Sequence, residues 1–259
     1  MKPFWKNSDE ISNRLASAPG LLVTLDFDGT LAALAETPDK ARLKPEFKAA
    51  LKALSSLYGV SVFILSGRGL KSVRRLVNLK NLYYGGNHGI EIAGPGFAWR
   101  DSEAARVRNL VAKAASDLQE RFPQGTGVLV ENKGFSASVH YRNLKVLYRR
   151  GFFSRMNALI SEKSRALHWR NGHKVFELLP KGSAHKGSAL NRLARKIGNP
   201  LCLAVGDDLT DEDMFNALAE RGITIRVGRK AGSKAGYFLS GQSEVLRLLR
   251  FITTARERK

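Results

Sequence analysis

The stretch LLVTLDFDGTL, residues 21–31, decides the fold. Residues 21–25 form a short apolar run, which is typical of a strand buried on both faces of a parallel sheet. Asp26 and Asp28 follow directly, at the carboxyl end of that strand, where open parallel sheets bind their ligands. One of these carboxylates can act as a nucleophile while the other handles protons. The stretch therefore predicts an α/β fold with reactive acidic groups at the edge of its sheet.

The same alternation of strands and helices extends to both sides of this stretch. Apolar periodicity predicts helices and short apolar runs predict strands. We expect helices over residues 44–58, 70–77, 186–196 and 244–252, and strands over residues 60–65, 201–205 and 223–227. The pattern favours a doubly wound (Rossmann-like) parallel sheet built from residues 1–93 and 181–259.

The pattern changes in residues 94–180. Here we expect helices over 104–122 and 145–165, and strands over 128–131, 135–142, 167–170 and 174–179. In the strand 135–142 apolar and polar residues alternate, so one face is predicted to be apolar and the other solvated. The segment is interpreted as an inserted α+β cap of αββαββ order.

Composition narrows the class of protein. The 259 residues include no apolar run of eighteen, and the N-terminal segment lacks the apolar core of a secretory signal. Cys202 is the single cysteine, which excludes an internal disulfide and a cysteine-built metal site. We therefore expect a cytoplasmic enzyme without a membrane partner, and we assume a monomer.

The net charge of +20 raises nucleic acid as a partner. The positive excess is spread over the whole chain rather than gathered in one arm. We interpret it as a solvated surface that attracts small anions, and nucleic-acid binding is kept as an alternative.

A second acidic turn, GDDLTDED at residues 206–213, follows the predicted strand 201–205. Two like charges about 4 Å apart repel by roughly 4 kcal/mol at an effective dielectric near 20. In so basic a chain such crowding predicts a bound cation, and hard oxygen ligands favour Mg²⁺. Glu212 and Asp213 stand where acids favour the start of a helix.

Two smaller elements complete the predicted site. Ser66 ends the strand 60–65, and Lys186 opens a helix whose free backbone N–H groups suit a phosphate. In this order, Asp26-x-Asp28-Gly-Thr, Ser66, Lys186 and Gly206-Asp207-x-x-x-Asp211 resemble the four motifs of the haloacid dehalogenase superfamily of phosphatases. That superfamily places its larger cap type between the second and third motifs, where the inserted unit lies.

Further stretches resemble the trehalose-6-phosphate phosphatase family more narrowly. They are residues 26–32, 66–68, 86–91, 131–142 and 206–215. The resemblance implies Mg²⁺-dependent hydrolysis of trehalose 6-phosphate to trehalose and phosphate through an aspartyl-phosphate. Sucrose 6-phosphate and mannosyl-3-phosphoglycerate remain as alternative substrates, and a non-catalytic regulatory or nucleic-acid-binding protein as an alternative class.

The resemblance also implies roles for individual residues. Asp26 is the expected nucleophile, Asp28 the general acid and base, and Ser66 and Lys186 the phosphoryl-binding groups. The expected Mg²⁺ ligands are the Asp26 carboxylate, the Asp28 backbone carbonyl, Asp207 and Asp211. Expected substrate contacts are Arg68, His88, Glu131, Lys133, Arg142 and Glu177, with His140 as a weaker candidate. Polar groups on the cap can reach sugar hydroxyls when the cap closes.

Overall fold

The computed structural model describes residues 1–122, 125–162, 164–172 and 174–257. The chain divides into two compact units. Unit 1 comprises Met1–Ala35, Asp39–Trp99 and Ala184–Lys259, and unit 2 comprises Glu36–Pro38 and Arg100–Ser183. No helix in the described ranges is both long and apolar enough to span a membrane.

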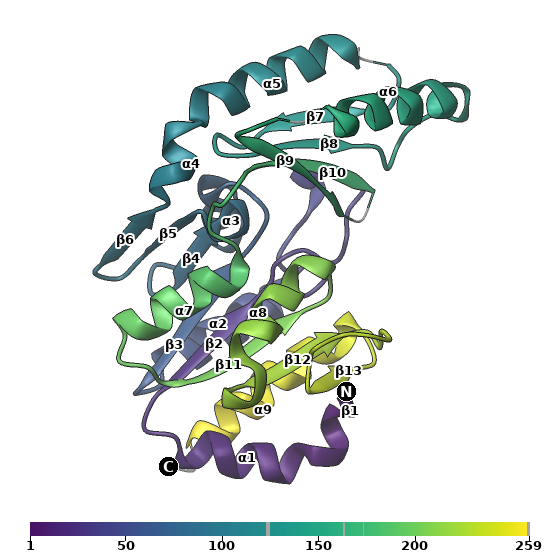
Figure 1. Ribbon diagram of the computed structural model, residues 1–259. Helices are drawn as coiled ribbons and strands as arrows, with labels where there is room; N and C mark the ends of the chain where they lie inside the picture. Colours follow the sequence, from purple (N-terminus) through teal and green to yellow (C-terminus); the bar gives the residue numbers. More distant parts are fainter. Residues whose placement is uncertain (123–124, 163, 173, 258–259) are drawn as a thin grey trace. The chain divides into compact units, whose positions relative to one another are not determined.

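Unit 1 is built on a mixed sheet (Figure 1). Its strands lie in the order β1-β13-β12-β11-β2-β3-β4-β5-β6. In chain order they are β1 (Lys2–Pro3), β2 (Leu21–Leu25), β3 (Val60–Leu65), β4 (Tyr83–Gly86), β5 (Glu91–Gly94), β6 (Phe97–Arg100), β11 (Leu201–Gly206), β12 (Ile223–Val227) and β13 (Tyr237–Leu239). The pairs from β1 to β4 are parallel, and β5 turns back antiparallel on β4. The sheet thus extends through β5 and β6, past the boundary predicted at residue 93.

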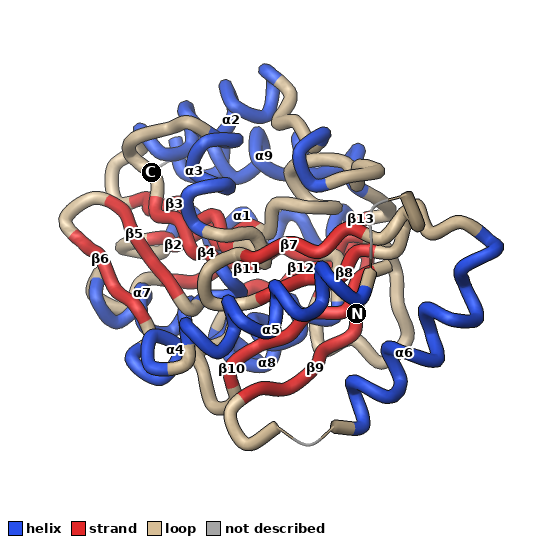
Figure 2. The backbone as a smooth tube through the Cα atoms, turned by 90° about the horizontal axis from the view of Figure 1, so that it is seen from above, coloured by secondary structure: helices blue, strands red, loops and turns tan. Residues whose placement is uncertain are grey.

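Helices cover both faces of this sheet, as Figure 2 shows from above. They are α1 (Ser8–Ser17), α2 (Pro45–Ser56), α3 (Leu70–Val77), α7 (Lys186–Lys196), α8 (Glu212–Leu218) and α9 (Val245–Glu257). Alternate residues of β2 separate the two layers: Val23 packs in the core formed with α1, α2, α3 and α9, while Leu22 packs with α7 and α8. This alternation explains the continuous apolar run, and the predicted doubly wound α/β core is confirmed.

Unit 2 has an antiparallel sheet of order β7-β8-β10-β9. Its elements are α4 (Ser102–Arg106), α5 (Arg108–Arg121), β7 (Leu129–Asn132), β8 (Ala137–His140), α6 (Arg149–Ser161), β9 (Leu167–Gly172) and β10 (Val175–Pro180). The predicted helix 145–165 begins instead with a 3₁₀ turn, Val146–Tyr148, and residue 163 of that prediction lies outside the described residues. The elements follow the predicted αββαββ order.

One face of the predicted strand 135–142 differs from the prediction. Ser136 and Ser138, expected on a solvated face, are fully buried. Ser138 Oγ donates a hydrogen bond of 3.4 Å to Glu177 on the neighbouring strand β10. Hydroxyl groups tolerate burial where they find such a partner.

Candidate active site

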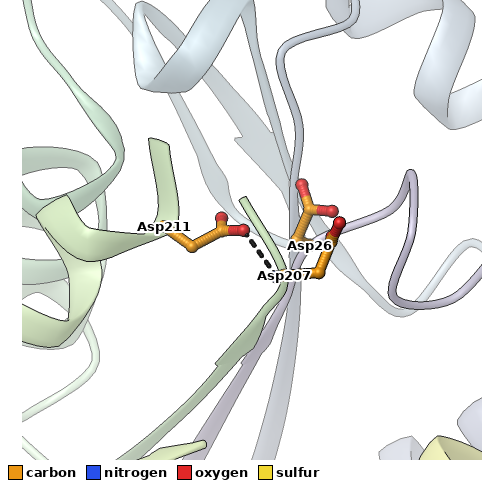
Figure 3. A group of neighbouring side chains, drawn as sticks. All are labelled: Asp26, Asp207 and Asp211. Carbon is orange, nitrogen blue, oxygen red and sulfur yellow. Dashed lines mark hydrogen bonds between the residues drawn. The ribbon is translucent and has the colours of Figure 1, made fainter. Parts of the chain in front are cut away.

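The acidic cluster lies at the carboxyl edge of the sheet in unit 1. Asp26 follows β2 and Asp207 follows the neighbouring strand β11, and the pairing of Leu25 with Val205 brings the two ends together. Asp211 ends the 3₁₀ turn after β11. One carboxylate oxygen from each aspartate lies within 4.8 Å of the others (Figure 3). The structure therefore brings together the two acidic turns that the sequence singled out.

Lys186 joins this cluster as the first residue of α7. Its side chain is only 2% exposed, and its Nζ donates to Asp26 Oδ1 at 2.6 Å and to Asp211 Oδ1 at 2.7 Å. Burial alone would lower the pKa of Lys186, but the carboxylates of Asp211 and Asp26 raise it above its ordinary value. The lysine is thus held as an ammonium ion.

The pKa values of two of the carboxyl groups are raised, which disfavours their ionised forms. Burial raises the pKa of Asp26 well above its ordinary value, with Lys186 acting against the shift and Asp211 and Asp207 adding to it. Burial and then the Asp211 charge raise the pKa of Asp207 to about 7. Three carboxylates against one ammonium leave the cluster short of positive charge.

Some carboxylate oxygens of the cluster accept hydrogen bonds, whereas one has no hydrogen-bond partner among the described residues. Asp211 Oδ2 accepts backbone N–H bonds from Asp207 at 2.9 Å, the dashed line in Figure 3, and from Asp208 at 3.0 Å. Asp207 Oδ1 accepts from Thr30 Oγ1 at 3.2 Å. Asp26 Oδ2 is buried and has no hydrogen-bond partner among the described residues. Asp211 thus shapes the turn, whereas Asp26 keeps one oxygen open.

The two acidic turns approach each other closely at Gly29. This residue has a φ of +90°, a conformation that favours glycine, and a Cβ there would collide with the Asp207 carboxylate. Gly29 therefore allows the close contact between the two turns as well as the backbone conformation of its own turn.

These residues fit a hard divalent cation. Carboxylate oxygens are the protein ligands that Mg²⁺ prefers, and the deficit of positive charge among three carboxylates and one ammonium suits a cation at this position. The side chain of Asp28 is not part of the group. The Mg²⁺ contact expected from its backbone carbonyl stays a prediction.

Asp28 instead forms a bidentate pair with Arg68. Arg68 Nε lies 2.7 Å from Asp28 Oδ2 and its Nη2 lies 2.6 Å from Oδ1. The guanidinium carbon also lies 5.4 Å from the centre of the Phe27 ring. Arg68, which we expected to contact the substrate, is thus placed on the predicted general acid and base.

Ser66 and His88 lie next to each other and contact the loop that carries Arg68. Ser66 is buried, and its Oγ accepts the backbone N–H of Arg68 at 3.1 Å. His88 is buried in a left-handed conformation, with a φ of 59°, and its backbone N–H donates to the Ser66 carbonyl at 3.0 Å. The close contact of its imidazole with Gly67 places His88 against the loop that carries Ser66 and Arg68.

The expected sugar-binding residues form their own cluster in unit 2. Lys133 Nζ lies 3.0 Å from Glu177 Oε1, and both side chains are under 10% exposed. His140 Nε2 lies 3.0 Å from Glu131 Oε2. Arg142 follows β8 and is exposed. Lys133 lies beyond the end of β7 and reaches the sheet through its long side chain.

Sequence reasoning missed Arg226, which lies on the buried strand β12. Its guanidinium donates to the backbone carbonyls of Asp207 and Asp208 and to Glu212 Oε1, the last at 2.9 Å. The signal was present, since an arginine inside the apolar run ITIRV requires a partner. Thr30 was quoted within its motif but given no role.

Comparison with known proteins identifies the family. The sequence profile of the trehalose-phosphatase family matches residues 24–243. Trehalose-phosphate phosphatase B of Arabidopsis thaliana is 31% identical over 258 residues, covering 93% of this chain and 68% of the relative. Trehalose-phosphate phosphatase of Mycobacterium tuberculosis strain H37Rv is 36% identical over 213 residues, covering 79% of this chain and 53% of the relative. The chain therefore spans about half the length of the mycobacterial relative.

A solved structure shows the same fold. The C-terminal domain of a C. albicans trehalose-6-phosphate phosphatase superposes with a TM-score of 0.79 at 23% identity, covering 96% of this chain and 97% of that chain. The family profile and the identities above 30% agree with this likeness and with the motifs at the sheet edge. This chain belongs to the trehalose-phosphatase family.

Proposed function

We propose that the chain is a Mg²⁺-dependent phosphatase that converts trehalose 6-phosphate to trehalose and phosphate. The observation that carries the proposal is the state of Asp26. One of its oxygens is held by the Lys186 ammonium and the other is buried without a hydrogen-bond partner among the described residues. A carboxylate fixed in this way has one oxygen available to attack phosphorus.

The first step transfers the phosphoryl group to the chain. An Asp26 oxygen forms a bond to phosphorus while the bond from phosphorus to the sugar oxygen breaks. Asp28, in its protonated form, gives its proton to the departing sugar oxygen, so that trehalose leaves as a neutral alcohol. The bidentate contact with Arg68 orients the Asp28 carboxylate and engages both of its oxygens as acceptors, so one of these two contacts opens when Asp28 carries the proton.

The second step releases phosphate. Asp28, now a carboxylate, takes a proton from water while the water oxygen forms a bond to phosphorus. The bond between phosphorus and Asp26 breaks, which restores the Asp26 carboxylate and the protonated Asp28. Two displacements thus return every group to its starting state.

Charge neutralisation is the other requirement of phosphoryl transfer. Lys186 supplies one positive charge beside Asp26, and the Ser66 hydroxyl can donate to a phosphoryl oxygen. The residues that would hold Mg²⁺ are Asp26, Asp207 and Asp211, together with the Asp28 carbonyl. When bound, the metal supplies positive charge that keeps the buried carboxylates ionised and offsets their repulsion of the phosphate.

Unit 2 supplies the sugar specificity in this proposal. Lys133 and Glu177 present charged hydrogen-bonding groups held by their pair with each other, and Glu131 presents one held by its pair with His140. Such groups can exchange part of these contacts for sugar hydroxyls. Arg142 and His88 are kept as proposed substrate contacts, whereas Arg68 acts on the substrate through Asp28. A cytoplasmic location and a monomeric state remain predictions.

The test measures phosphate release from trehalose 6-phosphate, sucrose 6-phosphate and mannosyl-3-phosphoglycerate, with Mg²⁺ and with a chelator. Asp26→Asn serves as the inactive variant, and Asp9→Asn on the exposed start of α1 is the matched control. We expect turnover of trehalose 6-phosphate that requires Mg²⁺ and that only Asp26→Asn abolishes.

Other outcomes would change the proposal in different ways. If another phosphosugar is hydrolysed in preference, the mechanism proposed for unit 1 stands and the assignment of unit 2 to trehalose recognition is wrong. No turnover of any substrate would favour the non-catalytic alternative, which a salt-sensitive gel shift with nucleic acid would then examine.

A further inference from the structure

Unit 1 contains a pocket that the proposed reaction does not use. It is a surface pocket of about 620 Å³, lined by residues of α7 from Ser188 to Arg195, the turn that follows α7, the start of β11, the end of α8 and the 3₁₀ turn after it. This volume falls in the range that proteins use for small ligands. The pocket is therefore large enough for a phosphorylated small molecule.

Three guanidinium groups line this pocket. Arg192 and Arg195 come from α7, and Arg221 comes from the 3₁₀ turn after α8. No Asp or Glu is among the lining residues, and none of the three arginines forms an ion pair in the described part of the chain. Arginines gathered without a carboxylate create a positive potential that attracts anions.

The helix dipole alone does not explain this grouping. Basic residues in the last turn of a helix are favourable, which accounts for Arg195 at the end of α7. It also accounts for Arg221, which donates Nη2 to the Ala217 carbonyl in the last turn of α8 at 2.9 Å, but not for Arg192. Arg192 is held apart from the helix end, with its guanidinium carbon 4.0 Å from the centre of the Trp99 ring.

The floor of the pocket is apolar. Ala194, Cys202 and Leu218 line it and are each less than 9% exposed. The side-chain amides of Asn191 and Asn199 add hydrogen-bonding groups to the wall. A charged rim above an apolar floor suits a phosphate group attached to a carbon skeleton better than a free inorganic ion.

The pocket is distinct from the candidate active site. Lys186 opens α7 and Arg195 lies nine residues further along, which at 1.5 Å per residue is about 13 Å along the helix axis. Cys202 likewise lies near the start of β11, whereas Asp207 follows its end. An anion among the three arginines is therefore not the reacting phosphate.

We propose that this pocket binds a small organic phosphate, with the phosphate among Arg192, Arg195 and Arg221 and the carbon skeleton on the floor formed by Ala194, Cys202 and Leu218. The inference is independent of the proposed reaction. A ligand in this pocket and a substrate at Lys186 could be bound at the same time, toward opposite ends of α7.

Cys202 provides a probe confined to this pocket, because it is the single cysteine of the sequence. Burial raises the pKa of its thiol to about 11, so alkylation by iodoacetamide is slow and is measured at about pH 9. The probes are inorganic phosphate and phenyl phosphate, added to the Asp26→Asn protein, which does not hydrolyse them. We expect both anions to slow alkylation at least about threefold, with phenyl phosphate acting at the lower concentration.

Variants make the test specific. Arg195→Gln/Arg221→Gln should lose the protection, whereas Arg247→Gln, an arginine of α9 that lies over Trp5, should keep it. The Arg221 charge lowers the Cys202 pKa, so each variant is compared with and without anion rather than with the parent. Equal protection by sodium chloride at the same ionic strength, protection that persists in the double variant, or none at all would overturn the proposal.

A thermal melt repeats the test without the reagent, for the case that Cys202 reacts too slowly. Phenyl phosphate should raise the melting temperature of Asp26→Asn by a few degrees, and part of this rise should disappear in the double variant and not in Arg247→Gln. Equal rises in both variants would place all anion binding at the active site and refute the second site. Phenyl phosphate that binds no more tightly than inorganic phosphate would remove the apolar floor from the proposal.

Discussion

Units 1 and 2 each hold a cluster of charged side chains on a sheet, and the two clusters differ in the ratio of acidic to basic groups. In unit 1 the carboxylates of Asp26, Asp207 and Asp211 face a single ammonium, that of Lys186. In unit 2 each of the two acids lies beside a basic side chain, Glu177 beside Lys133 and Glu131 beside His140.

The difference indicates what each cluster lacks. The cluster in unit 1 is electrostatically incomplete, since burial and mutual repulsion raise the pKa values of Asp26 and Asp207. Under the proposed function a bound cation would supply the missing positive charge. The cluster in unit 2 holds acids and basic groups side by side, and under the proposed function it would exchange hydrogen bonds with a neutral polyol without a change in charge. The predictions below separate these two behaviours.

The largest effect is expected from Asp26→Asn. An amide oxygen does not attack phosphorus, so kcat should fall by about 10⁴-fold or more. The measurement is phosphate release under saturating substrate, beside Asp9→Asn. Residual activity within tenfold of the parent would exclude Asp26 as the nucleophile.

Glu177→Gln should affect substrate binding rather than chemistry. It removes a charged partner from Lys133, and hydrogen bonds to charged groups are worth about 1.5–3 kcal/mol, so KM should rise about 10- to 100-fold. We expect kcat to change by less than about threefold. Glu120→Gln on the exposed face of α5 is the matched control. A fall in kcat at unchanged KM would contradict the assignment of unit 2 to the sugar.

Arg226→Gln tests whether the acidic turn needs its support. The loss of the contacts to the Asp207 and Asp208 carbonyls should weaken Mg²⁺ binding about tenfold, as is usual for groups that orient metal ligands. Titration of activity with Mg²⁺ measures this shift. Arg229→Gln, two residues after β12 and exposed, should leave the titration unchanged; equal effects of both variants would indicate a general loss of charge.

The smallest effect concerns pH and stability. The pKa of Asp207 is about 7 in the folded chain, above its value in the unfolded chain, so the folded state binds more protons between about pH 4 and 7. The stability of the metal-free chain should therefore fall as the pH rises through this range.

Bound Mg²⁺ favours the ionised carboxylates, so its effect should oppose this loss. The rise in melting temperature on adding Mg²⁺ should be a few degrees and greater at about pH 8 than at about pH 5.5. Glu131→Gln in unit 2 should leave that rise intact, and Asp207→Asn should remove most of it. A rise independent of pH would show that these carboxylates are ionised without the metal.

Much of unit 1 could be predicted because its signals are local. A strand buried on both faces is a continuous apolar run, and the residue after it lies at the carboxyl edge of the sheet. Asp26 and Asp207 could thus be placed together without knowledge of how β2 and β11 pair. The β5–β6 extension escaped prediction, since its short strands lack a comparable run.

Long-range pairs could not be predicted in the same way. Arg68 was expected on the substrate, and its bidentate contact with Asp28, forty residues away in sequence, depends on how β3 lies beside β2. The solvated face expected for the strand 135–142 was wrong at Ser136 and Ser138, because alternation shows which residues share a face but not whether that face is covered. Arg226 was detectable as a buried charge, although its partners were not.

Gly29 carries a consequence for variation in this protein. It has no functional group, yet its missing side chain leaves the space that the Asp207 carboxylate occupies, and its φ of +90° excludes most other residues. In a library of single substitutions selected for activity, tolerance at this position should be as narrow as at Asp26. Such a scan would therefore identify residues that leave room for the catalytic side chains as well as the catalytic side chains themselves.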